Sequence, residues 1–407
     1  MAPITYYKSR WVYPVDKPPI ENGWVGVSDG KIISVGQGNC DDGNPADLGD
    51  GVLLPALINA HTHLELSALK DRIPPGLGFL SWVQNILTLR ETVVNSDAAE
   101  SLENPLSELL KQGVAAVGDW STSLGINDIF YDSPVIRCGF YEIIGFSGQD
   151  LLLPDSINKN SEPRTLNSKL AFDSLGAHAP HTTSAALLRS AKVWTTDHGL
   201  PLSIHTAESI EEEEFLAKGG GPWEQLLRNR GRWNASWRPP GMSPVAYLDS
   251  LGILNETTQC IHLTRATGAD LGIIKSRQAK VVICPRSNHF ITGCLPPVVN
   301  MIDLGIAPAL GTDSLASNED LDLWEEMNFL ARSFPDLASD VILQTATLNG
   351  AASLGLEDSL GSITPGKKAS MLFIPLPAVA FTDLPAAIIA SKGKELKWIT
   401  DGLRFEV

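Results

Sequence analysis

Eight short apolar runs, most of them separated by a segment long enough for a helix, constrain the fold more than any other feature. They are GVLLPALINA, GVAAVGDW, VIRCGFYEIIG, LAFDSLGAHA, LPLSIHTAE, TQCIHLT, AKVVICPRSN and IAPALGTDS. Alternating strands and helices are typical of parallel βαβ units, and eight such strands close a (β/α)8 barrel. The sequence therefore predicts an α/β fold with a TIM-like barrel over residues 53–350. An open, doubly wound sheet is the alternative that periodicity alone leaves open.

The two ends of the chain differ in hydrophobic pattern from the region between them. Residues 1–52 contain alternating segments such as WVGVSD and KIISVGQG, and residues 351–407 contain the Pro-Gly turn of GSITPGKKAS before an apolar run. Such alternation around turn residues is typical of small antiparallel sheets. Neither end could bury a core alone, so we expect both to form one small β-sandwich lobe. The stretch LLLPDSINKNSEPRTLNSK is polar and is interpreted as an exposed loop.

The net charge and the cysteine content limit which partners the protein can bind and in which cellular compartment it is expected. Lys and Arg number 31 against 47 Asp and Glu, so the formal net charge is −16, whereas binding to nucleic acid or to anionic membranes needs clustered cations. The five cysteines form no Cys-x-x-Cys pair, which argues against a disulfide framework and a thiolate zinc site. The sequence also shows neither a signal peptide nor a membrane span. We therefore expect a cytoplasmic protein with no nucleic-acid or membrane partner.

Metal-competent side chains stand at the ends of four predicted strands. The first run ends in His61-Thr62-His63, the fifth in His205, the sixth in His262 and the eighth in Asp313. Each has an ordinary explanation alone: His205 or His262 as a core histidine, Asp313 as a helix N-cap. Together they would meet at the end of the barrel where active sites are built, and alternate strand residues point to one side. Three His and one carboxylate suit a divalent ion such as zinc.

These motifs resemble the amidohydrolase superfamily over nearly the whole chain. The resemblance is carried by PALINAHTHLE, IHTAES, the His of IHLT, GTDSLASN and GSITPGKKAS, although Ser370 stands where the closing segment usually has Asp. No Lys ends strand four, and a His-x-x-Glu pattern follows strand five, as in the mononuclear deaminase branch. The resemblance implies that His61, His63, His205 and Asp313 bind one Zn²⁺, with Fe²⁺ or another divalent ion as the alternative.

Three further residues fit the proton transfers of a deamination. A bound divalent ion lowers the pKa of water and so supplies hydroxide near pH 7. We expect Glu208 to protonate the ring nitrogen of an amidine such as adenine, His262 to hydrogen-bond the attacking hydroxide, and Asp313 to pass the water proton to the departing ammonia. Ester or amide hydrolysis has no obvious need for Glu208, which favours deamination. The ordinary alternative makes Glu208 the start of the acidic face that IEEEEF continues.

Four residues are candidates for substrate binding. In the deaminases that the chain resembles, the segment corresponding to LGAHAPHTT contacts the substrate sugar or tail, which implies such a contact for His178 or His181. Glu65 would bond a purine edge or a ribose hydroxyl, or merely brace its loop. Arg286 in CPRSN can clamp a carboxylate with two parallel hydrogen bonds, or pair with a neighbouring acid.

The combined motifs are most similar to deaminases of 6-amino-6-deoxyfutalosine, an adenine nucleoside with a benzoate tail, in the futalosine route to menaquinone. The resemblance therefore implies a zinc-dependent enzyme that forms futalosine and ammonia, takes a nucleoside-like small molecule and associates as a homodimer. Deamination of S-adenosylhomocysteine, methylthioadenosine or another purine or pyrimidine is the alternative, as is triazine chlorohydrolase or aminohydrolase activity. A non-catalytic binding protein is a remote alternative.

Overall fold

The computed structural model describes residues 3–40, 45–90, 104–122, 130, 133–147, 170–400 and 403–406. The chain divides into two compact units, one made of residues 1–60, 107–116 and 322–407, the other of residues 61–106 and 117–321. The boundaries expected at residues 52/53 and 350/351 stay predictions. The loop expected over residues 151–169 lies outside the described residues.

The predicted barrel strands form one sheet in the order of the sequence. These strands are β6 (Leu57–Thr62), β7 (Val114–Ser121), β8 (Ile136–Ile143), β9 (Leu170–Ala177), β10 (Leu202–Thr206), β11 (Thr258–His262), β12 (Lys280–Ile283) and β13 (Ala309–Leu310). The pairings from β8 to β13 are parallel. A parallel bridge also joins Thr62 to Asp313, so the first strand meets the end of the last. The barrel is confirmed, and the open sheet is excluded.

The first apolar run is divided between two sheets, which differs from the single strand expected. Gly51–Pro55 forms β5 of the terminal sheet, and Leu57–Thr62 forms β6 of the barrel. Proline has no N–H to donate to a ladder. Beyond it the chain changes partners: the N–H of Ala56 donates to the carbonyl of Ser370, and the N–H of Leu57 to that of Gly113. Because both halves are fully buried, hydrophobicity alone could not show this change.

A β lobe built from both chain ends is confirmed, and its described strands form one mixed sheet rather than the two packed sheets of the expected sandwich. Its order is β16-β15-β14-β5-β1-β2-β3, and β4 pairs with β1. The strands are β1 (Thr5–Val12), β2 (Ile20–Ser28), β3 (Lys31–Gln37), β4 (Ala46–Asp47), β5 (Gly51–Pro55), β14 (Met371–Pro375), β15 (Lys397–Thr400) and β16 (Leu403–Glu406). Its core contains Val25, Leu53 and Met371 from both ends of the chain, which explains why neither end needs a core of its own.

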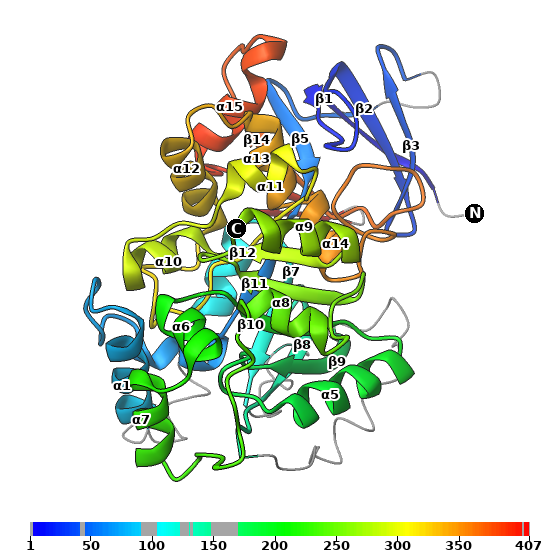
Figure 1. The fold of residues 1–407 in the computed structure, drawn as a ribbon. Coiled ribbons are helices and arrows are strands. Elements are labelled where there is room, and N and C mark those ends of the chain that lie inside the picture. Colours follow the sequence, from blue (N-terminus) through cyan, green and yellow to red (C-terminus); the bar gives the residue numbers. More distant parts are fainter. Residues whose placement is uncertain are drawn as a thin grey trace. The chain divides into compact units, whose positions relative to one another are not determined.

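Helices connect and cover the strands. The described ones are α1 (Phe79–Arg90), α5 (Ala185–Asp197), α6 (Ile210–Lys218), α7 (Gly221–Asn229), α8 (Pro244–Ser250), α9 (Gly268–Arg277), α10 (Pro285–Thr292), α11 (Val298–Asp303), α12 (Leu323–Ser333), α13 (Ser339–Thr345), α14 (Leu348–Ser353) and α15 (Leu384–Ser391), with short 3-10 helices at η1 (Leu64–Leu69) and η2 (Phe381–Asp383). Within the second unit, α5 lies beside β9 (Figure 1).

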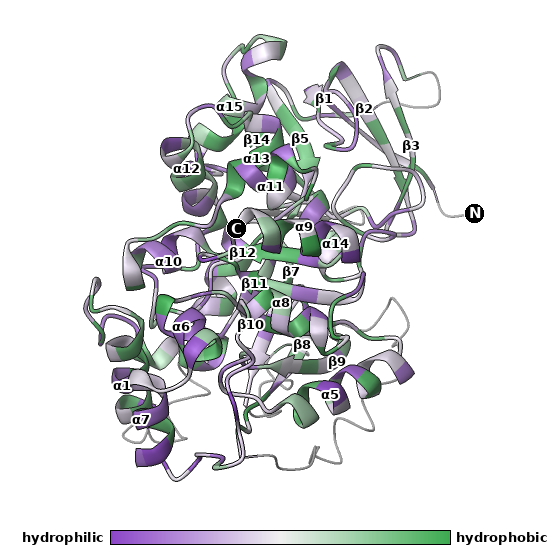
Figure 2. Ribbon diagram, in the orientation of Figure 1, coloured by the Kyte–Doolittle hydropathy of each residue, from purple (hydrophilic) through white to green (hydrophobic). Residues whose placement is uncertain are grey.

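The hydropathy of the strands and helices differs from one element to another. Strand β5 is largely hydrophobic, whereas α7 carries several hydrophilic residues (Figure 2). Ser209 caps α6 by accepting from the N–H of Glu212, and Thr267 and Asp270 form a capping box at α9, as these residue types favour. Among the described residues, no helix is long and apolar enough to cross a membrane.

Candidate active site

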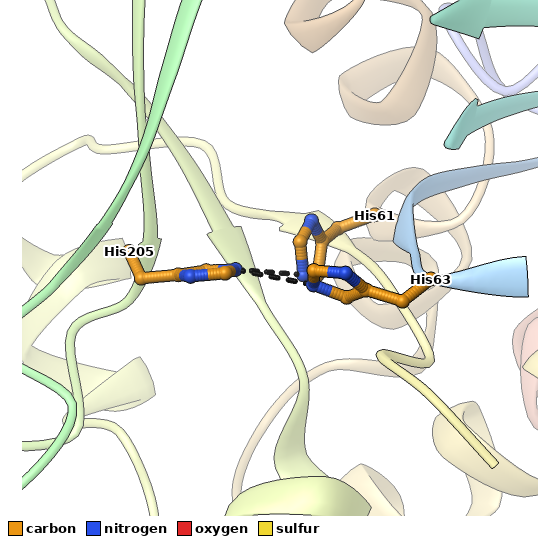
Figure 3. A group of neighbouring side chains, drawn as sticks. All are labelled: His61, His63 and His205. Atoms are coloured by element: carbon orange, nitrogen blue, oxygen red, sulfur yellow. Dashed lines mark hydrogen bonds between the residues drawn. The ribbon is translucent and has the colours of Figure 1, made fainter. Parts of the chain in front are cut away.

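Three imidazoles converge at the C-terminal ends of β6 and β10. Figure 3 shows His61 and His63 facing His205. The Nε2 atom of His205 lies 3.3 Å from that of His61 and 3.4 Å from that of His63. Zinc binds imidazole nitrogen at about 2.0–2.1 Å, so two such nitrogens in a tetrahedral site lie about 3.3 Å apart. The buried donor set therefore fits a divalent metal ion.

The protonation state and the packing of these rings suit metal binding. Burial, reinforced by the neighbouring histidines, lowers the pKa of His63 and of His205 well below the usual value. Both rings are therefore neutral at pH 7, the form in which histidine ligates a metal. The indole of Trp120 stacks on His205 with ring centroids 4.3 Å apart, which restricts the rotation of that imidazole.

Asp313 lies beside the histidines, after the last strand. Its Oδ1 is 3.7 Å from Nε2 of both His61 and His63, and its Oδ2 accepts hydrogen bonds from the hydroxyls of Ser287 and Ser317 at 2.6 and 2.9 Å. Burial alone would raise the pKa of Asp313, but its interactions with His61 and the other histidines outweigh burial and hold the pKa well below its usual range. The carboxylate is thus ionised and oriented toward the histidine cluster.

The backbone brings the last strand unusually close to the first. The N–H groups of Thr312 and Asp313 both donate to the carbonyl of His61. A Cβ added at Gly311 would lie 2.8 Å from the Cβ of His61, so only glycine permits this approach. His262 and Asp313 have φ angles of 75° and 57°. Non-glycine residues in this region carry a cost of order 1–3 kcal/mol, and such strain is often found at active sites.

Glu208 is a buried acid next to this cluster. Its Oε1 lies 3.6 Å from Nε2 of His262, and its backbone N–H donates to Oε2 of Glu212 at 2.8 Å. Burial, and then the negative charges of Asp313 and Glu212, raise the pKa of Glu208 well above the usual value. This environment favours the protonated form of Glu208, which is the form that a general acid needs.

Asn288 fixes the orientation of His262. Its Nδ2 contacts Nδ1 of His262 at 3.1 Å, and with the amide as the donor the ring proton is on Nε2, the nitrogen that faces Glu208. Burial lowers the pKa of His262 to about 4, so the ring is a neutral hydrogen-bond donor at pH 7. The expectation from sequence named His262 but not Asn288.

A cavity that includes His63 and His205 has both polar and apolar lining residues. Its other polar residues include Arg90, Glu142 and His178. The apolar residues that line it are Leu66, Phe79, Trp82, Val83, Ile86, Leu87 and Ile144. An aromatic ring system with polar substituents would complement this mixed lining.

The predicted substrate residues have different environments. His178 lines the cavity, and its Nδ1 pairs with the hydroxyl of Thr182 at 2.6 Å. His181 is fully buried and is not among the cavity residues; its Nδ1 is 3.7 Å from Oε1 of Glu212, and its ring packs on Trp223. The structure thus favours a substrate contact for His178 over His181.

Glu65 and Arg286 are both engaged in ion pairs. Glu65 Oε1 accepts from Arg90 at 2.6 Å, and its Oε2 accepts from the N–H of Thr122 at 2.8 Å. Arg286 donates to both carboxylate oxygens of Asp320, at 2.5 and 3.2 Å. Neither Glu65 nor Arg286 is among the residues that line the cavity. The bracing alternative that was left open for each residue fits these contacts, and the substrate roles stay predictions.

Sequence reasoning missed two charged residues of the cavity, Arg90 and Glu142. Glu142 stands at the end of the third barrel strand, in the position where the polar residues of four other strands were examined. The same strand-end rule would have found it. Arg90 ends α1, and its contact with Glu65 joins residues 25 positions apart in the chain, which no local motif encodes.

The comparisons with known proteins agree with this geometry. The model of the amidohydrolase family matches residues 52–395. The aminodeoxyfutalosine deaminase of Deinococcus radiodurans is 28% identical over 349 residues, covering 81% of this chain and 82% of that protein. The 5-methylthioadenosine/S-adenosylhomocysteine deaminase of Syntrophomonas wolfei is 29% identical over 406 residues, covering 91% and 85%.

The fold also matches a solved structure. The crystal structure of Helicobacter pylori aminofutalosine deaminase in complex with methylthio-coformycin aligns with a TM-score of 0.85 and 24% identity, covering 98% of this chain and 100% of that one. At this identity the similarity establishes the fold, and the chemistry of this chain has to be argued from its own residues.

Proposed function

Since the chain belongs to the amidohydrolase family and is a hydrolase of amidine C–N bonds, we propose that it deaminates an adenine-type nucleoside with one bound metal ion. The proposed substrate is 6-amino-6-deoxyfutalosine and the products are futalosine and ammonia, which would place the reaction in the futalosine route to menaquinone. A homodimer and a cytoplasmic location stay predictions.

The observation that carries this proposal is a buried acid with a raised pKa beside a metal-competent cluster. Glu208 lies 3.6 Å from His262, and both line the cavity with His63, His205 and Asp313. Hydrolysis of a simple ester needs no acid on the far side of the reacting carbon. A ring nitrogen that becomes protonated during the attack does need one.

The residues of the cluster would hold one Zn²⁺, with Fe²⁺ or another divalent ion as the alternative. His61, His63 and His205 would supply three imidazole nitrogens, and Asp313 one carboxylate oxygen. When bound, such an ion supplies a water-derived nucleophile at neutral pH. His262 would hold the attacking oxygen through its Nε2 proton, since Nδ1 is engaged by Asn288.

The proton balance follows from the positions of two carboxyl groups. Glu208 donates its proton to the ring nitrogen as the amidine carbon becomes tetrahedral. Asp313 accepts one proton of the attacking water and transfers it to the amine, so the C–N bond breaks with ammonia as the leaving group. The second water proton returns to Glu208 as the carbonyl forms. The ring nitrogen keeps the proton that it received.

The choice between two substrate classes depends on the tail of the nucleoside. Similarity to a methylthioadenosine/S-adenosylhomocysteine deaminase supports that class as the second candidate. The futalosine substrate has a benzoate, which needs a cation. Arg286 is the proposed partner, although its guanidinium would have to exchange Asp320 for the substrate. Arg90, which lines the cavity directly, is the other arginine placed to do so.

An ammonia-release assay across aminodeoxyfutalosine, methylthioadenosine, S-adenosylhomocysteine, adenosine and guanine tests the proposal. We expect aminodeoxyfutalosine to have the highest kcat/KM. A higher value for methylthioadenosine or S-adenosylhomocysteine would transfer the proposal to the second class. Release from none of the adenine nucleosides by metal-loaded protein would reject it.

A further inference from the structure

Glu142 is a buried carboxyl group without a hydrogen-bond partner among the described residues. It stands one residue before the end of β8, lines the cavity and is 8% exposed. Its carboxyl group lies 3.9 Å from Nε2 of His178, which is too long for a hydrogen bond. Burial lowers the pKa of His178 to about 3, so this imidazole is neutral at pH 7 and does not neutralise the carboxyl group. The oxygens of Glu142 are open to the cavity rather than sealed in the interior, so a ligand bound in the cavity can donate to them.

The neighbours of Glu142 limit what this ligand group can be. Arg90 and His178 line the same cavity as Glu142, together with a set of apolar residues. The metal-competent histidines and Glu208 are committed to the reacting amidine. The part of a nucleoside that offers two adjacent donors away from the amidine is the ribose, through its 2′- and 3′-hydroxyls. Burial raises the pKa of Glu142 to about 7, and above this pH its carboxylate can accept from both hydroxyls through its two oxygens.

We propose that Glu142 binds the ribose diol of the substrate and so selects ribonucleosides over deoxyribonucleosides. This inference rests on the proposed function and adds a specificity-determining residue to it. The neighbouring imidazole of His178 would complete the contact: its Nδ1 is held by Thr182, and its Nε2 faces Glu142.

Two other ligands could satisfy Glu142, and each has its own signature. An ammonium group, such as that of the amino-acid tail of S-adenosylhomocysteine, would pair with the carboxylate. A second metal ion would also satisfy it, since Glu142, His178 and His205 have donor atoms within 4.8 Å of one another. That site would have to share His205 with the first cluster, which argues against it.

The test compares adenosine, 2′-deoxyadenosine and 3′-deoxyadenosine as substrates of the metal-loaded full chain. Charge-assisted hydrogen bonds of this kind correspond to roughly 10- to 100-fold each. We expect the wild type to prefer adenosine by about this factor over either deoxynucleoside. Glu142→Leu should remove the preference, and Glu142→Gln should keep part of it. Glu108→Leu, a change at an exposed carboxylate, is the matched control and should keep it all.

The outcomes separate the two claims. Ammonia release from any adenine nucleoside, aminodeoxyfutalosine included, by the wild type decides the proposed function, whereas the ratio between adenosine and its deoxy analogues decides the role of Glu142. Equal losses on all three nucleosides in Glu142→Leu would overturn the diol contact. So would a loss confined to S-adenosylhomocysteine with methylthioadenosine unchanged, or a metal content that falls in the variant.

Discussion

The backbone N–H of Glu208 donates to the side-chain Oε2 of Glu212, 2.8 Å away, in the first turn of α6. Ser209 begins that helix and accepts from the N–H of Glu212. The cap of the helix therefore places a second, fully buried carboxylate directly behind the proposed acid. This arrangement orients Glu208 and, by repulsion, helps to keep it protonated.

Glu212→Gln should shift the pH dependence of kcat. Burial is the largest cause of the raised pKa of Glu208, and the charges of Asp313 and Glu212 add to it. Without the charge of Glu212, the pKa of Glu208 falls, so the acid loses its proton at a lower pH. We expect the basic limb of the profile of kcat against pH to move to lower pH. A profile that keeps its basic limb while only stability changes would contradict this role.

Removal of the metal should abolish activity and lower the thermal stability. His205→Ala deletes the nitrogen that lies within 3.4 Å of both other imidazole nitrogens. A ligand present at 1,000 times its Kd stabilises the folded state by about 4 kcal/mol, so the chelated protein should melt at a lower temperature. Elemental analysis and calorimetry check both effects. His198→Ala, on a ring stacked with Trp194 at the end of α5, is the control and should keep its metal.

The arginine that binds the benzoate tail should be identified by a variant that raises KM for aminodeoxyfutalosine but not for adenosine. Arg286→Ala removes the guanidinium now paired with Asp320. Arg90→Lys keeps the positive charge beside Glu65 but loses the planar guanidinium, which can make two parallel hydrogen bonds. We expect one of these variants to raise KM for aminodeoxyfutalosine about tenfold or more with adenosine unchanged, since a charge-assisted pair is lost. If both variants treat the two substrates alike, neither arginine binds the tail.

A buried ionic group in the barrel should be essential for stability. Arg137 donates to Asp119 and Asp173, each at 2.8 Å, and all three are buried. Asp119 also accepts from the N–H of Leu64, next to the metal-competent His63. Removing one partner of a buried pair typically costs about 3–5 kcal/mol. Arg137→Met should therefore lower the free energy of unfolding by this amount, measured with denaturant.

The control for this experiment is an arginine in an exposed pair. Arg277 contacts Asp249 at 2.6 Å on the surface of the molecule. Because solvent screens such pairs, Arg277→Met should leave stability nearly unchanged. Similar losses in both variants would mean that the burial of Arg137 does not matter.

Much of the fold could be predicted because the strands are distinct in hydrophobicity and end in polar residues. The histidines at the ends of β6 and β10 were found by one rule, that barrels place their chemistry at the C-terminal ends of strands. The change of sheet at Pro55 could not be found, since residues on both sides are equally apolar. Partners such as Asp320 for Arg286 depend on loop conformation, which sequence periodicity does not determine.

The central claim is that a protonated Glu208 works beside a metal held by other residues. The most direct measurement is kcat together with metal content for Glu208→Gln, with Glu214→Gln on the exposed side of α6 as the control. The account predicts about one divalent ion per chain in both variants. It also predicts a kcat lower by about 10²- to 10⁴-fold in Glu208→Gln alone. A Glu208→Gln enzyme that keeps its metal and deaminates at the wild-type rate would contradict it.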